Sequence, residues 1–132
     1  MKYTYTKPLR DKDGKFLFTK ELKDNWLKAL KSGEFIQHGG VLQDTENHKK
    51  QCCLGVLVTI HPDISIGRTY FSGLNSCIVN KKQVNYTPFD EMKIHTGCKV
   101  DLANNNDKSF DAGVRDYSEV IPLIKTLKTT DI

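Results

Sequence analysis

The sequence lacks the features that place a protein in a membrane or an export pathway. Its longest largely apolar stretch, Cys52 to Ile60, has nine residues, whereas a helix needs about 20 apolar residues to cross a bilayer. Residues 1–8 contain no apolar run of the kind that a signal peptide requires. We therefore expect a protein without a membrane span that stays in the cytoplasm, where it is made.

The chain lacks the cysteine spacing of a disulfide or zinc framework. Cys52 and Cys53 are adjacent, the other two are Cys77 and Cys98, and no C-x-x-C motif occurs. Neighbouring cysteines do not readily pair, and a reducing cytoplasm disfavours disulfides. A zinc site could recruit His48 and Cys52 with Cys77 or Cys98, but the close pair of ligands typical of such sites is missing. We predict buried free thiols, no metal and no cofactor.

Signatures of known enzyme families are also absent. Phosphate-binding loops, dinucleotide-binding glycine motifs, metalloprotease and serine-hydrolase motifs, and EF-hands do not occur. A thiol nucleophile would have to pair Cys53 or Cys77 with one of four histidines, and thiols inside apolar runs are generally inert. We therefore predict no catalytic residues. Enzymatic activity is kept only as an alternative to the leading functional hypothesis.

The sequence does have enough length and hydrophobic content for one domain. A chain of 132 residues, 38% of them hydrophobic, can bury roughly two-thirds of the surface that its unfolded state exposes. We predict a single domain over residues 1–132. The net charge of +4 suits small anionic ligands but is below that of dedicated duplex-binding domains. Because acids interrupt the lysines of the first predicted helix, we expect no sequence-specific nucleic-acid recognition.

The N-terminal region predicts an arm followed by a helix. Residues 1–18 are polar and basic, which favours an extended arm or a short strand packed on the domain. Thr19 is a suitable N-cap, and Ser32-Gly33 is a stop signal. The only tryptophan, Trp26, is predicted to anchor the core. The apolar side chains recur at helical spacing between these signals: Leu22, Trp26, Leu27 and Leu30.

The middle of the chain is predicted to be mainly β. Residues 34–42 alternate loosely, which indicates a short strand leading into a loop. Residues 52–60 are apolar on all sides, so periodicity leaves a buried helix and a buried strand open, and Pro62 ends either one. Further strands are predicted at residues 64–71, 77–79 and 84–86, the last two forming a hairpin around residues 80–83.

The C-terminal region predicts a turn and then a helix. Asn104 to Asp107 is rich in turn-forming residues and predicts an Asx turn. From Asp116 onward apolar residues recur at helical spacing, with Pro122 confining the start of the helix. The residues on this face are Tyr117, Val120, Ile121, Ile124 and Leu127.

Three segments resemble a family of small, mostly uncharacterised proteins of tailed bacteriophages. Residues 25–37 contain the pattern W-x3-L-x-S-G-x3-Q, and residues 51–57 read Q-C-C-L-G-V-L. A looser third similarity joins an N-D pair to a later aromatic residue and helix. Its members here are Leu102, Asn106, Asp107, Tyr117, Ile121 and Ile124.

The resemblance implies a helix at residues 52–61, which favours one of the two alternatives left open above. The expected fold is therefore α+β: a small, mainly antiparallel sheet with an N-terminal helix, a central buried helix and a C-terminal helix. The resemblance also implies phage origin and a cytoplasmic location in an infected bacterium. It implies no settled activity.

Several residues have the chemistry that nucleotide binding requires. Phosphates need cations or backbone N–H groups, a base needs an aromatic face, and ribose hydroxyls need amides or carboxylates. The loop His38-Gly39-Gly40 could bind an anion through its N–H groups. A surface arginine on a strand, a solvated hairpin tip and an Asx turn are the plain structural alternatives. The candidate ligand-binding residues are Arg68, Tyr70, Phe71, Lys81, Lys82, Asn106 and Asp107.

Small phage proteins outside the virion often counter host defence. The leading expectation is therefore an anti-defence protein that sequesters a nucleotide-derived immune signal, of cyclic nucleotide or ADP-ribose type, without cleaving it. The alternatives are a protein-binding inhibitor of a host defence enzyme and a small enzyme that degrades such a signal. Because a small domain encloses a ligand more easily between subunits, we expect a homo-oligomer.

Overall fold

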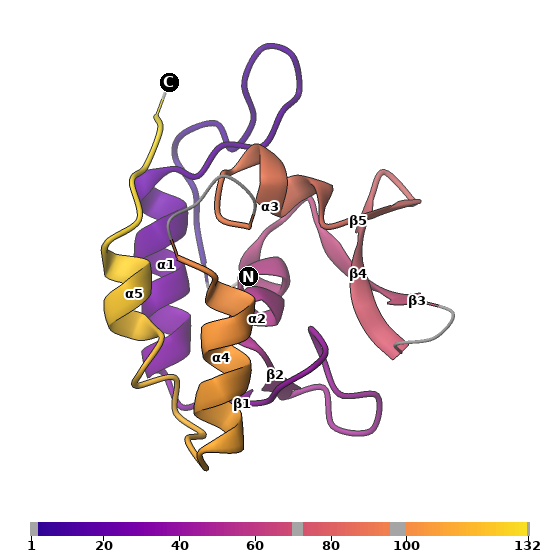
Figure 1. Cartoon of the computed structure of the whole chain (residues 1–132). Helices are drawn as coiled ribbons and strands as arrows, with labels where there is room; N and C mark the ends of the chain where they lie inside the picture. The colour runs from indigo at the N-terminus through magenta and orange to yellow at the C-terminus, as the bar shows by residue number, and fades with distance from the viewer. Residues whose placement is uncertain (1–2, 70–72, 96–99, 132) are drawn as a thin grey trace.

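A buried helix, α2, lies at the centre of the fold, with helices on one side and a three-stranded sheet on the other (Figure 1). The structure is a computed structural model that describes residues 3–69, 73–95 and 100–131. The predicted α+β class is confirmed. The elements are α1 (Lys20–Lys31), β1 (Ile36–Gln37), β2 (Lys50–Gln51), α2 (Cys53–Ile60), β3 (Ser65–Thr69), β4 (Gly73–Val79), β5 (Lys82–Asn85), α3 (Thr87–Glu91), α4 (Leu102–Asp111) and α5 (Ile121–Lys125).

Helix α1 has the ends and the buried face that its sequence predicts. The Thr19 hydroxyl accepts a hydrogen bond from the N–H of Leu22 at 3.1 Å, which satisfies one of the free donors of the first turn. Gly33 follows the C-cap Ser32 with φ of +79°, a conformation that suits glycine. Trp26 is fully buried, and its Nε1–H donates to the carbonyl of Cys53 at 2.8 Å.

Residues 53–60 form a helix, so the favoured alternative for this apolar segment is confirmed. Every residue of α2 except Thr59 is buried, which explains why the segment shows no amphipathic period. Gly55 is required because any Cβ at this position would collide with the carbonyl oxygen of Leu42. The helix ends at Ile60, two residues before Pro62.

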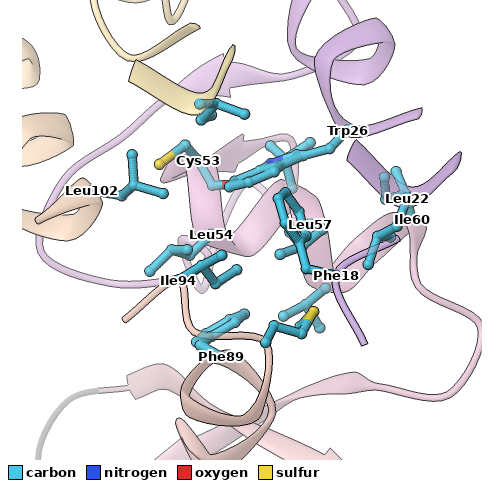
Figure 2. Close-up of a cluster of buried hydrophobic side chains, with 14 of the residues drawn as sticks. Phe18, Leu22, Trp26, Cys53, Leu54, Leu57, Ile60, Phe89, Ile94 and Leu102 are labelled. Atoms are coloured by element: carbon cyan, nitrogen blue, oxygen red, sulfur yellow. The ribbon is translucent and has the colours of Figure 1, made fainter. Parts of the chain in front are cut away.

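Side chains from the arm, α1, α2, α3 and α4 meet in one hydrophobic core around α2 (Figure 2). The arm contributes Phe18, and Phe89 of α3 lies at the bottom of the cluster in this view, with Trp26 at the top. No helix in the described part of the chain is both long enough and apolar enough to span a membrane.

The three-stranded sheet is antiparallel, with the order β3-β4-β5. The predicted hairpin is present, but its strands are longer and its loop is shorter than expected. Asn80 and Lys81 have φ of +53° and +67°, the conformation of a two-residue turn that matches the twist of a hairpin. A separate parallel pair, β1 and β2, joins Ile36 to Lys50 and Gln37 to Gln51.

The C-terminal region differs from its prediction. The prediction of an Asx turn at Asn104 to Asp107 is wrong, because these residues lie inside α4. Helix α4 begins before this segment, at Leu102. Asp101 is its N-cap, because its carboxylate accepts a hydrogen bond from the N–H of Asn104 at 3.0 Å. Helix α5 is shorter than predicted, with Pro122 in its first turn, where a missing N–H costs little. Helix α3 was not predicted.

The N-terminal arm packs on the domain as expected, although it forms only an isolated bridge between Arg10 and Phe16 instead of a strand. The carboxylate of Glu21 holds it by accepting from the N–H groups of Thr6 and Lys7 at 2.9 Å. Tyr5 donates its hydroxyl proton to the carbonyl of Ile60 at 2.8 Å. The arm is therefore fixed to both α1 and the end of α2.

Candidate functional site

Four residues from the three similar segments meet in a buried hydrogen-bond network, which we call the amide clasp: Gln37, Cys53, Asn106 and Tyr117. The side-chain amide of Gln37 donates to both the carbonyl and the Oδ1 of Asn106 at 3.3 Å, and its oxygen accepts from the N–H of Tyr117 at 2.8 Å. Asn106 Oδ1 also accepts from the N–H of Cys53 at 3.1 Å. The clasp thus joins β1, α2, α4 and the segment before α5.

Tyr117 closes the clasp at a strained position. Its φ of +63° is unusual for an aromatic residue and costs on the order of 1 kcal/mol or more. The two hydrogen bonds offset this strain, because the backbone N–H donates to Gln37 and the hydroxyl donates to the carbonyl of Gln51 at 2.7 Å. Burial raises the pKa of Tyr117 far above its ordinary value, so the phenol is neutral and can donate.

Asn106, predicted as a ribose contact, has both ends of its side chain engaged inside the protein. Its Nδ2 donates to the carbonyl of His38 at 2.7 Å, while its Oδ1 accepts from Gln37 and Cys53. The residue is fully buried. In this structure Asn106 serves the fold.

Asp107, the second predicted ribose contact, is half-buried and holds the loop at residues 38–40. Its Oδ1 accepts from the N–H of Gly40 at 3.0 Å, and the N–H of His38 donates to the carbonyl of Gln51 at 3.0 Å. Two of the three N–H groups of the suggested anion-binding loop are therefore already bonded. A protein carboxylate occupies one of them, which makes the loop a poor anion site.

The basic residues predicted to bind phosphate lie at different ends of the sheet. Arg68 pairs with Leu74 at one end of β4, and Lys82 pairs with Val79 at the other. At about 3.3 Å per residue, these positions are about 17 Å apart. Lys81 lies beside Lys82 in the exposed turn. The sheet therefore does not bring Arg68 together with either lysine, and the two predicted aromatic residues, Tyr70 and Phe71, lie outside the described residues.

The described cysteines do not have the properties of nucleophiles. Cys52, Cys53 and Cys77 are buried free thiols, as predicted. Burial raises the pKa of Cys52 to about 11 and that of Cys77 to about 12, so both stay protonated at neutral pH. Within residues 3–69, 73–95 and 100–131 there is no group of three or more side chains that could hold a metal ion. Cys98 lies outside these ranges.

A small cleft lies between the helices and the sheet, but it has little room. Its volume is about 80 Å³, well below the roughly 300 Å³ at which small-molecule pockets begin. Tyr86 donates to the side-chain oxygen of Asn75 at 2.7 Å and lies with its ring 5.0 Å from that of His95. Asp107 also lines the cleft. A cleft of this size holds a few water molecules.

The better candidate by its chemistry is a surface groove beside the parallel strand pair, which we call the Arg115 groove; its volume of about 130 Å³ is also too small to enclose a ligand, so a ligand would lie on its surface. Residues of a strand alternate between two faces, and here the inward members of the pair are Gln37 and Gln51, both buried. The outward members, Ile36 and Lys50, face the groove. The groove is lined by Ile36, Gln37, His38, Lys50, Phe110 and Arg115.

Arg115 is held in a fixed orientation over an aromatic ring. Its guanidinium carbon lies 4.0 Å from the centre of the Phe110 ring, within the range of a cation–π contact. Its Nη1 donates to the carbonyls of Phe110 and Val114 at 2.8 and 2.9 Å. The carbonyl of Arg115 accepts from the N–H of Gln37 at 2.9 Å, so the clasp residue next to the groove positions this segment.

The groove combines cations with apolar surface. Lys50 and Arg115 are exposed, and neither forms an ion pair with a carboxylate in the described parts of the chain. The pKa of Asp44 is lowered mainly because its carboxylate accepts from the N–H of Asn47. The charge of Lys50 lowers this pKa only slightly. Ile36, 38% exposed, is the one large hydrophobic side chain that is exposed among the described residues.

Sequence reasoning missed the main groove residues, Lys50, Phe110 and Arg115. They come from β2, from the end of α4 and from the loop after it, and no short-range pattern links them. The one usable signal in the sequence was the alternation along the short strand at residues 36–37, which indicates that Ile36 and Gln37 lie on opposite faces of that strand.

A protein-family model matches part of the chain. The family model described as "Domain of unknown function (DUF8296)" matches residues 18–67. This range contains α1, β1, β2 and α2, and therefore the first two similar segments, but it ends before Asn106 and Tyr117. No curated protein and no solved structure matches the chain.

Proposed function

We propose that the protein binds a phosphate-bearing nucleotide in the Arg115 groove and holds it without breaking it. In an infected bacterium such binding would withdraw a nucleotide-derived immune signal, of cyclic nucleotide or ADP-ribose type, from host defence. The protein is then a phage-encoded anti-defence protein that acts by sequestration.

One observation carries this proposal: two cations that form no ion pair with any described carboxylate line a groove with an aromatic and apolar surface. The charges of Lys50 and Arg115 can neutralise phosphate oxygens. The stacked Phe110 and Arg115, with exposed Ile36, offer a surface for a base. The sheet supports the proposal less, because its register separates Arg68 from Lys82.

Binding without turnover agrees with the chemistry of the groove. Lysine, arginine, isoleucine and phenylalanine side chains bind ligands well but supply no nucleophile at neutral pH. The imidazole of His38 lies edge-on to the Phe110 ring, with ring centres 5.0 Å apart, and its Nε2 lies 3.8 Å from a carboxylate oxygen of Asp44. It thus lies within existing packing and has no described nucleophile to activate.

The test is native mass spectrometry of the protein purified from infected, defence-active cells, with heat release of any bound molecule. We expect an intact nucleotide, and calorimetric titration should then show that Lys50→Ala and Arg115→Ala each weaken its binding about tenfold or more. Arg68→Ala and Lys82→Ala, equal in charge change but on the sheet, are the matched controls and should leave the affinity within about twofold. The mass also reports whether the protein is the expected homo-oligomer.

Three results would overturn the proposal. A protein free of small molecules that co-purifies with a host enzyme would favour the protein-binding inhibitor. Release of a degraded nucleotide, with turnover that depends on a histidine or cysteine, would favour the enzyme. A bound nucleotide whose affinity falls with Arg68→Ala but not with Arg115→Ala would place the site on the sheet.

A further inference from the structure

We infer that the Arg115 groove selects its ligand by stacking, with a nucleobase on the outer face of the Arg115 guanidinium and a phosphate at Lys50. The inference rests on the proposed function and adds the ligand class. Purine nucleotides should bind, whereas inorganic phosphate and sugar phosphates lack the group that the groove recognises best.

The first step of the argument is the fixed orientation of Arg115. One face of its guanidinium covers the Phe110 ring at 4.0 Å, and Nη1 is tied to two backbone carbonyls. The residue is nevertheless exposed. A planar group with one face on an aromatic ring and the remainder in solvent is a preformed stacking surface, since bases stack on guanidinium planes as they do on aromatic rings.

The second step is the packing that holds Phe110 in place. A Cβ on Gly39 would lie 2.8 Å from the Phe110 ring, so the loop and the ring are in close contact and glycine is needed there. His38 meets the same ring at its edge, with ring centres 5.0 Å apart. Phe110 is thus fixed from two sides, and binding requires little ordering of the side chains that form the stack.

The third step is the position of the charge and of the apolar surface. Lys50 is the register partner of Ile36, and both side chains face outward from the parallel pair. Ile36 gives the groove an apolar side that a base can cover and that a free phosphate cannot use. An ammonium on one strand and a stacked guanidinium across the groove match a ligand with an anionic end and a flat aromatic end.

The experiment compares adenosine 5′-monophosphate with ribose 5-phosphate and inorganic phosphate by calorimetry at one fixed salt concentration. The nucleotide should bind about tenfold more tightly than ribose 5-phosphate, the difference expected from one stacked base. Arg115→Lys keeps the charge but removes the planar face. It should weaken nucleotide binding about tenfold and leave binding of ribose 5-phosphate within about twofold.

Two further measurements exclude a simple folding defect. Thermal unfolding should show the same Tm for Arg115→Lys and for Arg68→Lys, the matched control. The Arg115 Nε–H resonance should shift upfield on addition of the nucleotide, because a stacked ring shields it, and should not shift with ribose 5-phosphate.

The outcomes separate this inference from the proposed function. If Arg115→Ala weakens nucleotide binding but Arg115→Lys does not, the stack is wrong and a phosphate contact in the groove remains. If Lys50→Ala, Arg115→Ala and Arg115→Lys all leave nucleotide affinity unchanged, both fail. Equal affinity of the wild-type protein for the nucleotide and ribose 5-phosphate also overturns the stacking inference.

Discussion

The amide clasp and the three-stranded sheet contribute to the molecule in different ways. In the clasp, side-chain amides and a phenol from distant segments bond to one another and to buried backbone groups. In the sheet, β5 is largely exposed, and both strand pairings contain an irregularity. The clasp therefore depends on particular residues, whereas most outward residues of the sheet can be exchanged.

This difference changes how the segments singled out in the sequence are interpreted. Gln37, Asn106 and Tyr117 each belong to a similar segment, and each is fully buried in the clasp. In this chain these three residues therefore serve the fold. The surface that we propose for ligand binding lies on the outward side of the same strand pair, at Ile36 and Lys50, where the clasp positions it without forming part of it.

The largest expected effect comes from cutting the clasp at its centre. Asn106→Ala leaves the N–H of Cys53 and the carbonyl of His38 without their partner, and the Gln37 amide keeps only its bond to the backbone carbonyl of residue 106. We expect a loss of about 3 to 5 kcal/mol in the free energy of unfolding, measured by urea denaturation. Asn104→Ala, on an exposed position of the same helix, is the matched control and should change it by less than about 0.5 kcal/mol. Equal effects of the two variants would contradict the clasp.

The next prediction concerns pH. The clasp contains no group that titrates between pH 4 and 7, whereas the residue at the end of α2, His61, does. Burial lowers the pKa of His61 from 6.5 to about 4. Between these two pH values the histidine is protonated in the unfolded chain but not in the folded protein. The free energy of unfolding is therefore highest above pH 6.5 and declines as the pH falls toward 4. The decline attributable to His61 should be on the order of 3 kcal/mol.

Urea denaturation at pH 7, 5.5 and 4.5 checks this dependence. His61→Leu should remove most of the slope, whereas Asn106→Ala should lower stability by the same amount at each pH. A wild-type slope that persists in His61→Leu would show that other groups cause it.

A smaller effect compares one phenol of the clasp with one phenol of the sheet. Tyr117→Phe removes the phenol donor to the buried carbonyl of Gln51, which then accepts only from the N–H of His38, and we expect a loss of about 1 kcal/mol. Tyr86→Phe removes a half-buried hydrogen bond to Asn75, which water can replace, and should cost about 0.5 kcal/mol. Thermal and urea unfolding of both variants measure the difference, and a larger loss for Tyr86→Phe would reverse the comparison.

The smallest effect concerns the N-terminal arm. The pKa of Glu21 lies below its ordinary value of 4.5, mainly because the hydroxyl of Thr6 donates to the carboxylate. The carboxylate therefore stabilises the docked arm above that pH, and the contribution is lost as the pH falls through the lowered pKa. Glu21→Gln should speed hydrogen exchange at Thr6 and Lys7 at pH 7 and leave exchange at Cys53 unchanged. Unchanged exchange at all three amides would show that the carboxylate does not hold the arm.

The sequence predicted the elements whose cause is local. Helix α1 followed from Thr19, Ser32-Gly33 and the apolar spacing between them, and the hairpin followed from its two apolar runs. Helix α4 did not follow, because Asn104 to Asn106 favour turns in isolation. The fold overrides that preference by giving the Asn106 amide three partners from distant segments.

The candidate site was less predictable than the fold. Arg68 and Lys82 are close in sequence, but the length of β4 separates them. Lys50 and Arg115 are far apart in sequence and line the same groove only because the clasp ties β1 to the segment after α4. A pattern read along the chain does not contain that connection.

Native-state hydrogen exchange is the most direct test of the clasp. The N–H of Cys53 donates to Asn106, and the N–H of Tyr117 donates to Gln37, so both should exchange only when the whole molecule unfolds. The N–H groups of β5, at residues 82–85, should exchange through local opening at a clearly lower free energy. Exchange at Cys53 and Tyr117 as fast as that in β5 would contradict the claim that the clasp holds the fold together.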